Sequence, residues 1–183
     1  MKSKNILLTS AILAVLLVGC NMKAPIQTPK TPKTSQTTQK TPKVITATSM
    51  VSTPKEFEKA ISKDGIQTIN MKKSLTINKD LVVNGEFRND KALLERKINL
   101  YSQDKAKNIG DRLTLAVPKL IIKSTQTSME HGNFKGDLYI SANNFQLIDT
   151  KVDGNVYFTT PEAKNTCKMD AKSKVTGKQE SRK

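Results

Sequence analysis

Hydrophobic and polar positions divide the chain into three regions. Residues 6–18 are almost continuously apolar, residues 21–53 are polar and rich in Pro, Thr and Lys, and the remainder alternates short apolar runs with polar or glycine-containing breaks. Short runs of Ile, Val, Leu and Thr separated by such breaks are typical of β-strands. The pattern therefore predicts a folded region of mostly β-structure, preceded by two segments outside its core.

One short α-helix is predicted where the folded region starts. Thr53 can cap the helix, Pro54 suits the first helical position, and Glu56 completes a capping box. Gly65 provides the stop, because glycine readily adopts the left-handed conformation found at helix ends. The apolar positions on one helix face are Phe57, Ala60 and Ile61.

Nine strands are expected after the helix, at 66–71, 74–77, 81–83, 98–101, 113–117, 120–123, 138–141, 145–148 and 156–159. No second helix is expected between them. Residues 91–112, which include the run at 98–101, are as a whole too polar for regular coils and are predicted to form a protruding hairpin or loop. Since helices join the parallel strands of α/β folds, their absence leaves an antiparallel sandwich or a β-solenoid.

An internal repeat favours the solenoid. Lys-Gly-Asp-Leu-Tyr-Ile at 135–140 recurs eighteen residues later as Asp-Gly-Asn-Val-Tyr-Phe at 153–158, and Thr-Gly-Lys at 176–178 is a degenerate third copy. A glycine at a corner followed by an alternating strand, repeated about every twenty residues, is the pattern of strands that stack turn upon turn.

These features resemble a known group of folds. The capped helix followed by 66–69 and 74–81 is similar to the opening of right-handed parallel β-helix domains of the pectate-lyase-like superfamily, and the eighteen-residue repeat is similar to bactofilin-type β-helices. The resemblance implies an all-β fold: a short right-handed parallel β-helix with an N-terminal capping α-helix, covering residues 54–178 and followed by a basic tail at 179–183.

The first nineteen residues are predicted to be an export signal. Lys2 and Lys4 precede the apolar run at 6–18, which is too short for a typical membrane-spanning helix. The run ends in Leu17, Val18, Gly19 and Cys20, which resembles the lipobox of bacterial lipoproteins. An ordinary signal peptide, or a membrane helix with a chance cysteine, is the alternative.

The lipobox resemblance implies a specific modification. In bacterial lipoproteins a signal peptidase recognises the three residues before the cysteine and cleaves there, and a diacylglyceryl group is joined to the cysteine sulfur. For this chain, the resemblance implies that the signal peptidase recognises Leu17, Val18 and Gly19. It also implies that Cys20 is the lipid attachment site and carries palmitate-type chains. Two or more acyl chains make anchoring stable. The implied location is the extracytoplasmic face of the cell membrane, and the Lys-, Asn- and Ile-rich composition fits a Gram-positive organism.

Residues 20–53 are predicted to be a lipid-anchored linker. The tripeptide Thr-Pro-Lys recurs at 28–30, 31–33, 41–43 and 53–55, and no acidic residue is present before Glu56. Such a segment cannot form a core, and its prolines favour an extended spacer. Its lysines either contact anionic lipid headgroups or wall polymers, or simply keep a solvated tether extended.

The amino-acid composition limits the kinds of partner that the folded region is expected to bind. The formal charge is +15, but acidic and basic residues are mixed throughout the folded region, which is ordinary for a soluble surface. With no Trp and eight aromatic residues in all, a broad stacking platform for nucleic acid is hard to build, so no nucleic-acid partner is expected. Membrane lipid through Cys20, an anionic wall polymer and self-association are the partners considered.

Candidate catalytic groups are few. Asp137, Asp149 and Asp153 are the best candidates for a carboxylate cluster of the polysaccharide lyase kind, although an Asp after Gly at a corner is more often a turn residue. His131 is the single histidine, expected at the surface, and Cys167 is followed by Lys168, which can lower a thiol pKa. No catalytic residue, metal site or cofactor is predicted.

The sequence thus favours a non-catalytic surface lipoprotein with a structural or binding role in the cell envelope. Two alternatives stay open. A small polysaccharide-active enzyme of the pectate-lyase-like class requires the three aspartates to converge on one groove, and an antiparallel β-sandwich adhesin requires hairpin pairing within residues 113–123.

Overall fold

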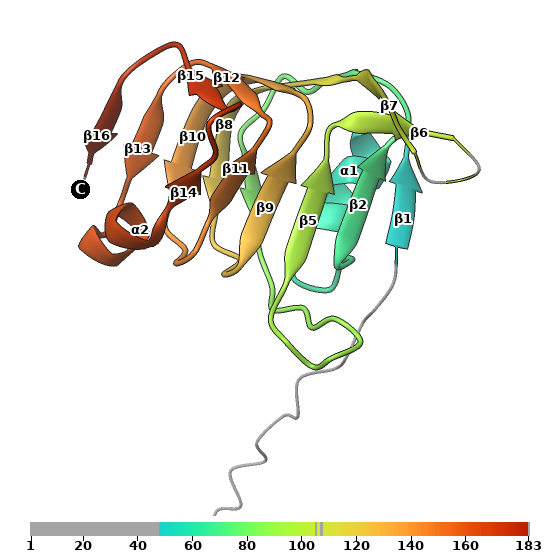
Figure 1. Cartoon of the computed structure of the whole chain (residues 1–183), viewed down its shortest axis with the longest axis horizontal. Helices are drawn as coiled ribbons and strands as arrows, with labels where there is room; N and C mark the ends of the chain where they lie inside the picture. Colours follow the sequence, from blue (N-terminus) through green and yellow to red (C-terminus); the bar gives the residue numbers. More distant parts are fainter. Residues whose placement is uncertain (1–47, 105, 107, 183) are drawn as a thin grey trace, which may run out of the picture. The chain divides into compact units, whose positions relative to one another are not determined.

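The computed structural model describes residues 48–104, 106 and 108–182, and these form an all-β fold with two parallel sheets (Figure 1). Sheet A has the order β1-β2-β5-β9-β11-β14, with strands β1 (Thr48–Val51), β2 (Thr68–Met71), β5 (Arg96–Asn99), β9 (Thr127–Glu130), β11 (Gln146–Ile148) and β14 (Lys168–Met169). Sheet B contains β3 (Leu75–Thr76), β4 (Leu81–Val83), β8 (Thr114–Ile122), β10 (Asn133–Ile140), β12 (Lys151–Asp153), β13 (Val156–Phe158), β15 (Lys174–Val175) and β16 (Gln179–Ser181).

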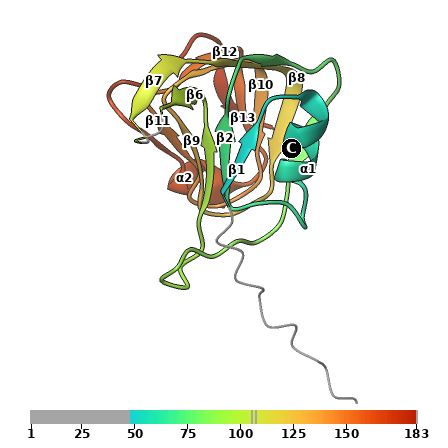
Figure 2. The ribbon, with the colours of Figure 1, turned by 90° about the vertical axis from the view of Figure 1, so that its right-hand side faces the viewer.

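The chain visits the two sheets alternately. From β2 onward, each sheet A strand is followed by one or two sheet B strands, and strands of successive circuits pair in parallel. Figure 2 looks along the stack of strands and shows sheets A and B on opposite sides of the interior. This parallel pairing contradicts the antiparallel sandwich, because residues 114–122 form the single strand β8 rather than a hairpin.

The eighteen-residue repeat is confirmed as a structural register. Leu138, Tyr139 and Ile140 pair with Val156, Tyr157 and Phe158. Glycine is required at the same point of two successive circuits. A Cβ on Gly136 would lie 1.8 Å from the Val117 carbonyl oxygen, and a Cβ on Gly154 would lie 1.9 Å from the Gly136 carbonyl oxygen. The backbones of successive circuits therefore approach each other closely at this corner.

The predicted helix is present as α1 (Pro54–Ile61). Thr53 and Glu56 form the expected capping box, and the helix packs against β1, β2 and β4 through the buried face of Phe57, Ala60 and Ile61. It ends at the C-cap Ser62, slightly before the expected glycine stop.

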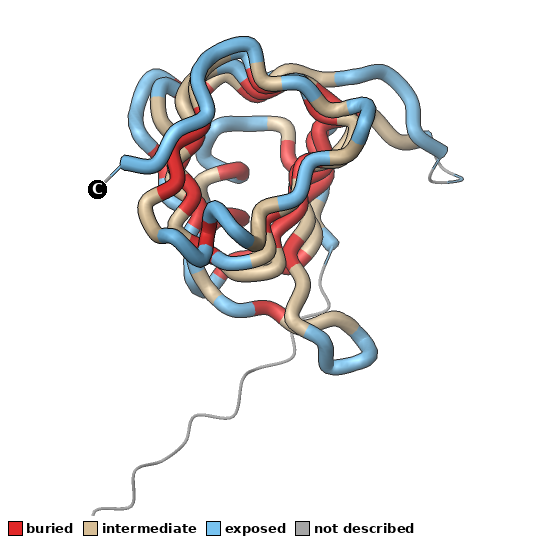
Figure 3. Tube along the Cα trace, turned by 60° about the vertical axis from the view of Figure 1, so that its left-hand side comes forward, coloured by how far each residue is buried: buried red, intermediate tan, exposed pale blue. Residues whose placement is uncertain are grey.

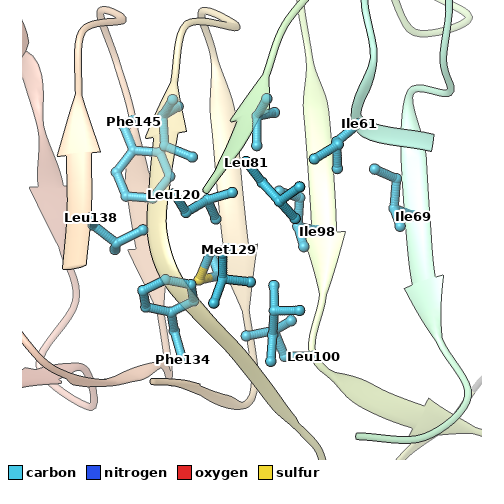
Figure 4. Close-up of a cluster of buried hydrophobic side chains, with 14 of the residues drawn as sticks. Ile61, Ile69, Leu81, Ile98, Leu100, Leu120, Met129, Phe134, Leu138 and Phe145 are labelled. Carbon is cyan, nitrogen blue, oxygen red and sulfur yellow. The ribbon is translucent and has the colours of Figure 1, made fainter. Parts of the chain in front are cut away.

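The core lies between the sheets. Inward-facing aliphatic and aromatic side chains from successive circuits stack on one another, and Figure 4 shows Leu120, Met129, Phe134, Leu138 and Phe145 meeting in this space. Figure 3 shows the buried segments, in red, where the strands face each other across the interior. Burial of such side chains is the main stabilising contribution to the fold.

A buried arginine links the end of helix α1 to the core through hydrogen bonds. Arg96 is fully buried and donates to the carbonyl oxygens of Ala60 at 2.6 Å and Ser62 at 3.3 Å, and also to that of Asn84. Its guanidinium carbon lies 4.2 Å from the centre of the Phe87 ring. Burial lowers the pKa of Arg96 to about 9, so the group keeps its charge at neutral pH.

Several segments differ from the sequence prediction. Strand β1 lies within the range predicted as linker, and β16 lies within the predicted basic tail. A second helix, α2 (Pro161–Thr166), is present, with Thr160 as N-cap. The polar segment 91–112 contains strand β5 as well as the antiparallel hairpin of β6 (Tyr101–Gln103) and β7 (Ile109–Arg112). Within the described part of the chain, neither helix has the length and apolar character needed to cross a membrane.

Candidate functional site

A polar groove runs over the outer face of sheet A. Because side chains alternate along a strand, the neighbours of the buried Ile69, Ile98 and Met129 point outward. Register places these outward positions in two rows, Thr68-Lys97-Ser128-Gln146 and Asn70-Asn99-Glu130-Ile148. Two adjoining hollows share Lys97 and Glu130, and together they extend from Thr48 to Ile148; we call them the sheet A groove.

A pair of amides forms the floor of this groove. Asn99 Nδ2 donates to Asn70 Oδ1 at 2.6 Å, and the two side chains are buried, with exposed fractions of 4% and 3%. Asn99 Oδ1 is buried, and none of the described residues donates a hydrogen bond to it. A buried acceptor without a partner costs about 1–3 kcal/mol.

The rim of the groove carries hydroxyl and amide groups, one lysine and two glutamates. Lys97 Nζ lies 3.2 Å from a carboxylate oxygen of Glu95, and the Ser128 hydroxyl donates to Glu130. At the end nearest the hairpin, Gln103 Nε2 donates to the Tyr101 hydroxyl at 3.1 Å. The groove therefore offers many donors and acceptors, with one more acidic than basic side chain.

His131 lies at the corner between β9 and β10, next to Asp149 at the corresponding corner one circuit later. Both residues have positive φ, 56° and 45°. His131 Nδ1 lies 3.2 Å and Arg112 Nη1 2.9 Å from Asp149 Oδ2, and the Tyr101 ring meets the His131 ring edge-on at 5.3 Å. The hydrogen bond with His131 and the Arg112 guanidinium hold the pKa of Asp149 below its usual value.

The three candidate aspartates do not form one cluster. Asp137 Oδ1 accepts from the Asn155 backbone at 3.0 Å and from Asn155 Nδ2 at 2.9 Å, whereas Asp153 Oδ1 accepts from the Thr176 hydroxyl at 3.2 Å. Asp149 belongs to the His131 corner instead. Among the residues that the structure describes, no three His, Cys, Asp or Glu side chains are grouped so that they could hold a metal ion.

Cys167 ends helix α2 as its C-cap and packs, half-buried, against the core. Burial raises the pKa of its thiol to about 11, so the neighbouring Lys168 does not make it a reactive thiolate at neutral pH. The predicted lipid site, Cys20, and the recognition residues Leu17, Val18 and Gly19 lie outside the described residues.

Sequence reasoning did not find the groove. Its floor joins residues 29 positions apart, since the first two circuits differ in length from the eighteen-residue repeat. The prediction that residues 91–112 protrude as a hairpin or loop was wrong at Arg96, because this buried residue begins the core strand β5. Helix α2 had a usable signal, since Thr160-Pro161 repeats the Thr53-Pro54 start of α1.

Comparison with known proteins found no matching family model, no matching curated protein and no matching solved structure.

Proposed function

We propose that the chain is a lipid-anchored envelope protein that binds glycan without transforming it. The lipobox-like residues Leu17 to Cys20 support the anchor, and the Pro-rich segment supports a spacer between membrane and folded region. The setting is then the extracytoplasmic face of a cell membrane, where wall polymers are the abundant ligands.

In this proposal the folded region is a short right-handed parallel β-helix. Parallel pairing between successive circuits, the stacked glycine corners and the α1 helix packed at β1, β2 and β4 support it. Helix α1 would then cover the first circuit and protect its core. Such a coil presents long, straight rows of side chains, and rows of that kind suit an extended polymer.

The observation that carries the binding role is the sheet A groove with its Asn70–Asn99 floor. Hydroxyl-rich sugars present donors and acceptors in turn, as the side chains lining the groove do. Neighbouring strands lie about 4.8 Å apart, which is close to the advance of one pyranose in an extended β-1,4-linked chain. The separation of Asp137, Asp149 and Asp153 favours binding over the lyase alternative.

Isothermal titration of the full chain, in a non-ionic detergent, with a hexamer of N-acetylglucosamine tests the glycan role. The Lys97→Ala/Gln103→Ala double variant removes two side chains that line the groove without touching the core and is expected to weaken binding at least about tenfold. Asn143→Ala, an exposed change outside the groove, is the control and should bind as the unaltered chain does. Equal binding by all three proteins, or none by the unaltered chain, would contradict the proposal.

A further inference from the structure

The outer face of sheet B carries a lysine in each of four successive circuits. Lys119 lies on β8, Lys135 on β10, Lys151 on β12 and Lys174 on β15, and these strands are neighbours in that order. All except the half-buried Lys119 are exposed. Lys151 and Lys174 are in register, whereas Lys135 is in register with Asp153 and Lys119 with Asp137. The four lysines therefore form an oblique basic line that crosses the sheet from circuit to circuit.

The charges on this line are not neutralised within the described part of the chain. Lys151 and Lys174 are directly paired in register, and like charges facing each other across a sheet repel. None of the four lysines forms an ion pair with a described residue. The nearby carboxylates of Asp137 and Asp153 instead accept hydrogen bonds from Asn155 and Thr176. Their amino groups are therefore open to an external anion.

Two tyrosines support one side of this surface. The rings of Tyr139 and Tyr157 pack together with centroids 4.8 Å apart. Lys119 Nζ lies 4.5 Å from the centre of the Tyr139 ring, and the guanidinium carbon of Arg182 lies 4.5 Å from that of Tyr157. Arg182 Nη1 also donates to the Tyr139 hydroxyl at 3.1 Å. Cation–π contacts restrain these two side chains, so their positive groups stand in fixed positions.

We propose that this face binds a linear polyanion whose charges are phosphodiester groups. The lysines follow an oblique line across neighbouring strands rather than converging on one point, which suits an extended polymer better than a small anion. The inference rests on the proposed function only for its envelope setting; the site itself is separate from the groove.

The test uses linear poly(glycerol phosphate) with the full chain in non-ionic detergent, and binding is followed by fluorescence anisotropy. Lys135→Gln/Lys151→Gln/Lys174→Gln should weaken binding at least about tenfold. Lys55→Gln/Lys59→Gln/Lys91→Gln removes the same charge from exposed positions off sheet B and should change binding by no more than about twofold. Affinity for the polymer should fall steeply with added salt, and less steeply in the sheet B variant.

Two results would overturn the inference: equal weakening by both triple variants, or binding to phosphatidylglycerol vesicles that exceeds binding to the polymer. The N-acetylglucosamine hexamer separates this inference from the proposed function. Hexamer binding that survives the sheet B substitutions while polymer binding is lost supports two separate sites. Polymer binding without hexamer binding contradicts the groove proposal and leaves the sheet B site standing.

Discussion

Asn155 donates both its backbone N–H and its side-chain Nδ2 to Oδ1 of Asp137, the residue eighteen positions earlier. The next circuit continues the pattern, since the Lys178 backbone N–H donates to Asn155 Oδ1 at 2.9 Å. Together with Gly136, Gly154 and Gly177, these residues make one corner repeat from circuit to circuit. The Gly-polar motif seen in the sequence therefore links one circuit to the next through hydrogen bonds.

Replacing Asp137 by Ala should destabilise the fold. The substitution removes the acceptor for two donors of Asn155, and we expect a loss of about 1–2 kcal/mol in the free energy of unfolding. Asp153→Ala, which removes one longer hydrogen bond at an exposed position, should cost less than about 0.5 kcal/mol. Urea denaturation of both variants measures the difference, and equal losses would argue against the corner as a link between circuits.

Arg96→Met should also destabilise the fold, by about 2 kcal/mol, because the carbonyl oxygens of Asn84 and Ser62 lose a buried donor. The matched change Arg88→Met affects a half-buried arginine that donates to Ala92 in the same loop, and it should cost less than about 0.5 kcal/mol. Thermal unfolding followed by circular dichroism compares the two. A stability of Arg96→Met equal to that of the unaltered chain would show that the buried guanidinium does not hold α1 in place.

The His131 corner predicts a dependence of stability on acid. The folded-state pKa of Asp149 lies below its usual value of 3.8, so its stabilising contribution is fully present above that pH and is lost as the pH falls through the folded-state pKa. Asp149→Asn keeps a side chain that tolerates the positive φ but removes the charge. The thermal midpoint should therefore drop less between about pH 5 and about pH 3 in this variant than in the unaltered chain. Asp111→Asn, at an exposed hairpin position, is the control and should follow the unaltered chain; an identical drop in all three would contradict the assignment.

The features that could be predicted from the sequence depend on residues close together in the chain or on a repeat of constant length. Thr53, Pro54 and Glu56 act through contacts within one helical turn, and Gly136 and Gly154 act through a repeat of constant length, so both features could be recognised without a structure. The floor of the groove could not be recognised from the sequence, because the Asn70–Asn99 contact depends on the lengths of two irregular circuits. Strand β9 was missed since Thr127 and Ser128 are polar, although both are buried in the fold.

The basic line on sheet B was also not predicted from the sequence. Lys119, Lys135, Lys151 and Lys174 are sixteen, sixteen and twenty-three residues apart, and only the pairing of their four strands brings them onto one face of the sheet. A charge count along the chain treats them as ordinary solubilising lysines. Spatial grouping without a regular sequence interval is the reason that composition alone did not reveal this surface.

The measurement that tests the account most directly is metabolic labelling with palmitate, followed by membrane fractionation, in a bacterium that processes lipoproteins. The unaltered chain and Cys167→Ala should both be labelled and recovered with membranes, since Cys167 is a half-buried packing residue. Cys20→Ala should lose the label and be released from lipid anchoring. Retention of Cys20→Ala in membranes to the same extent, with no label on the unaltered chain, would contradict the lipid-anchored display on which the proposed function depends.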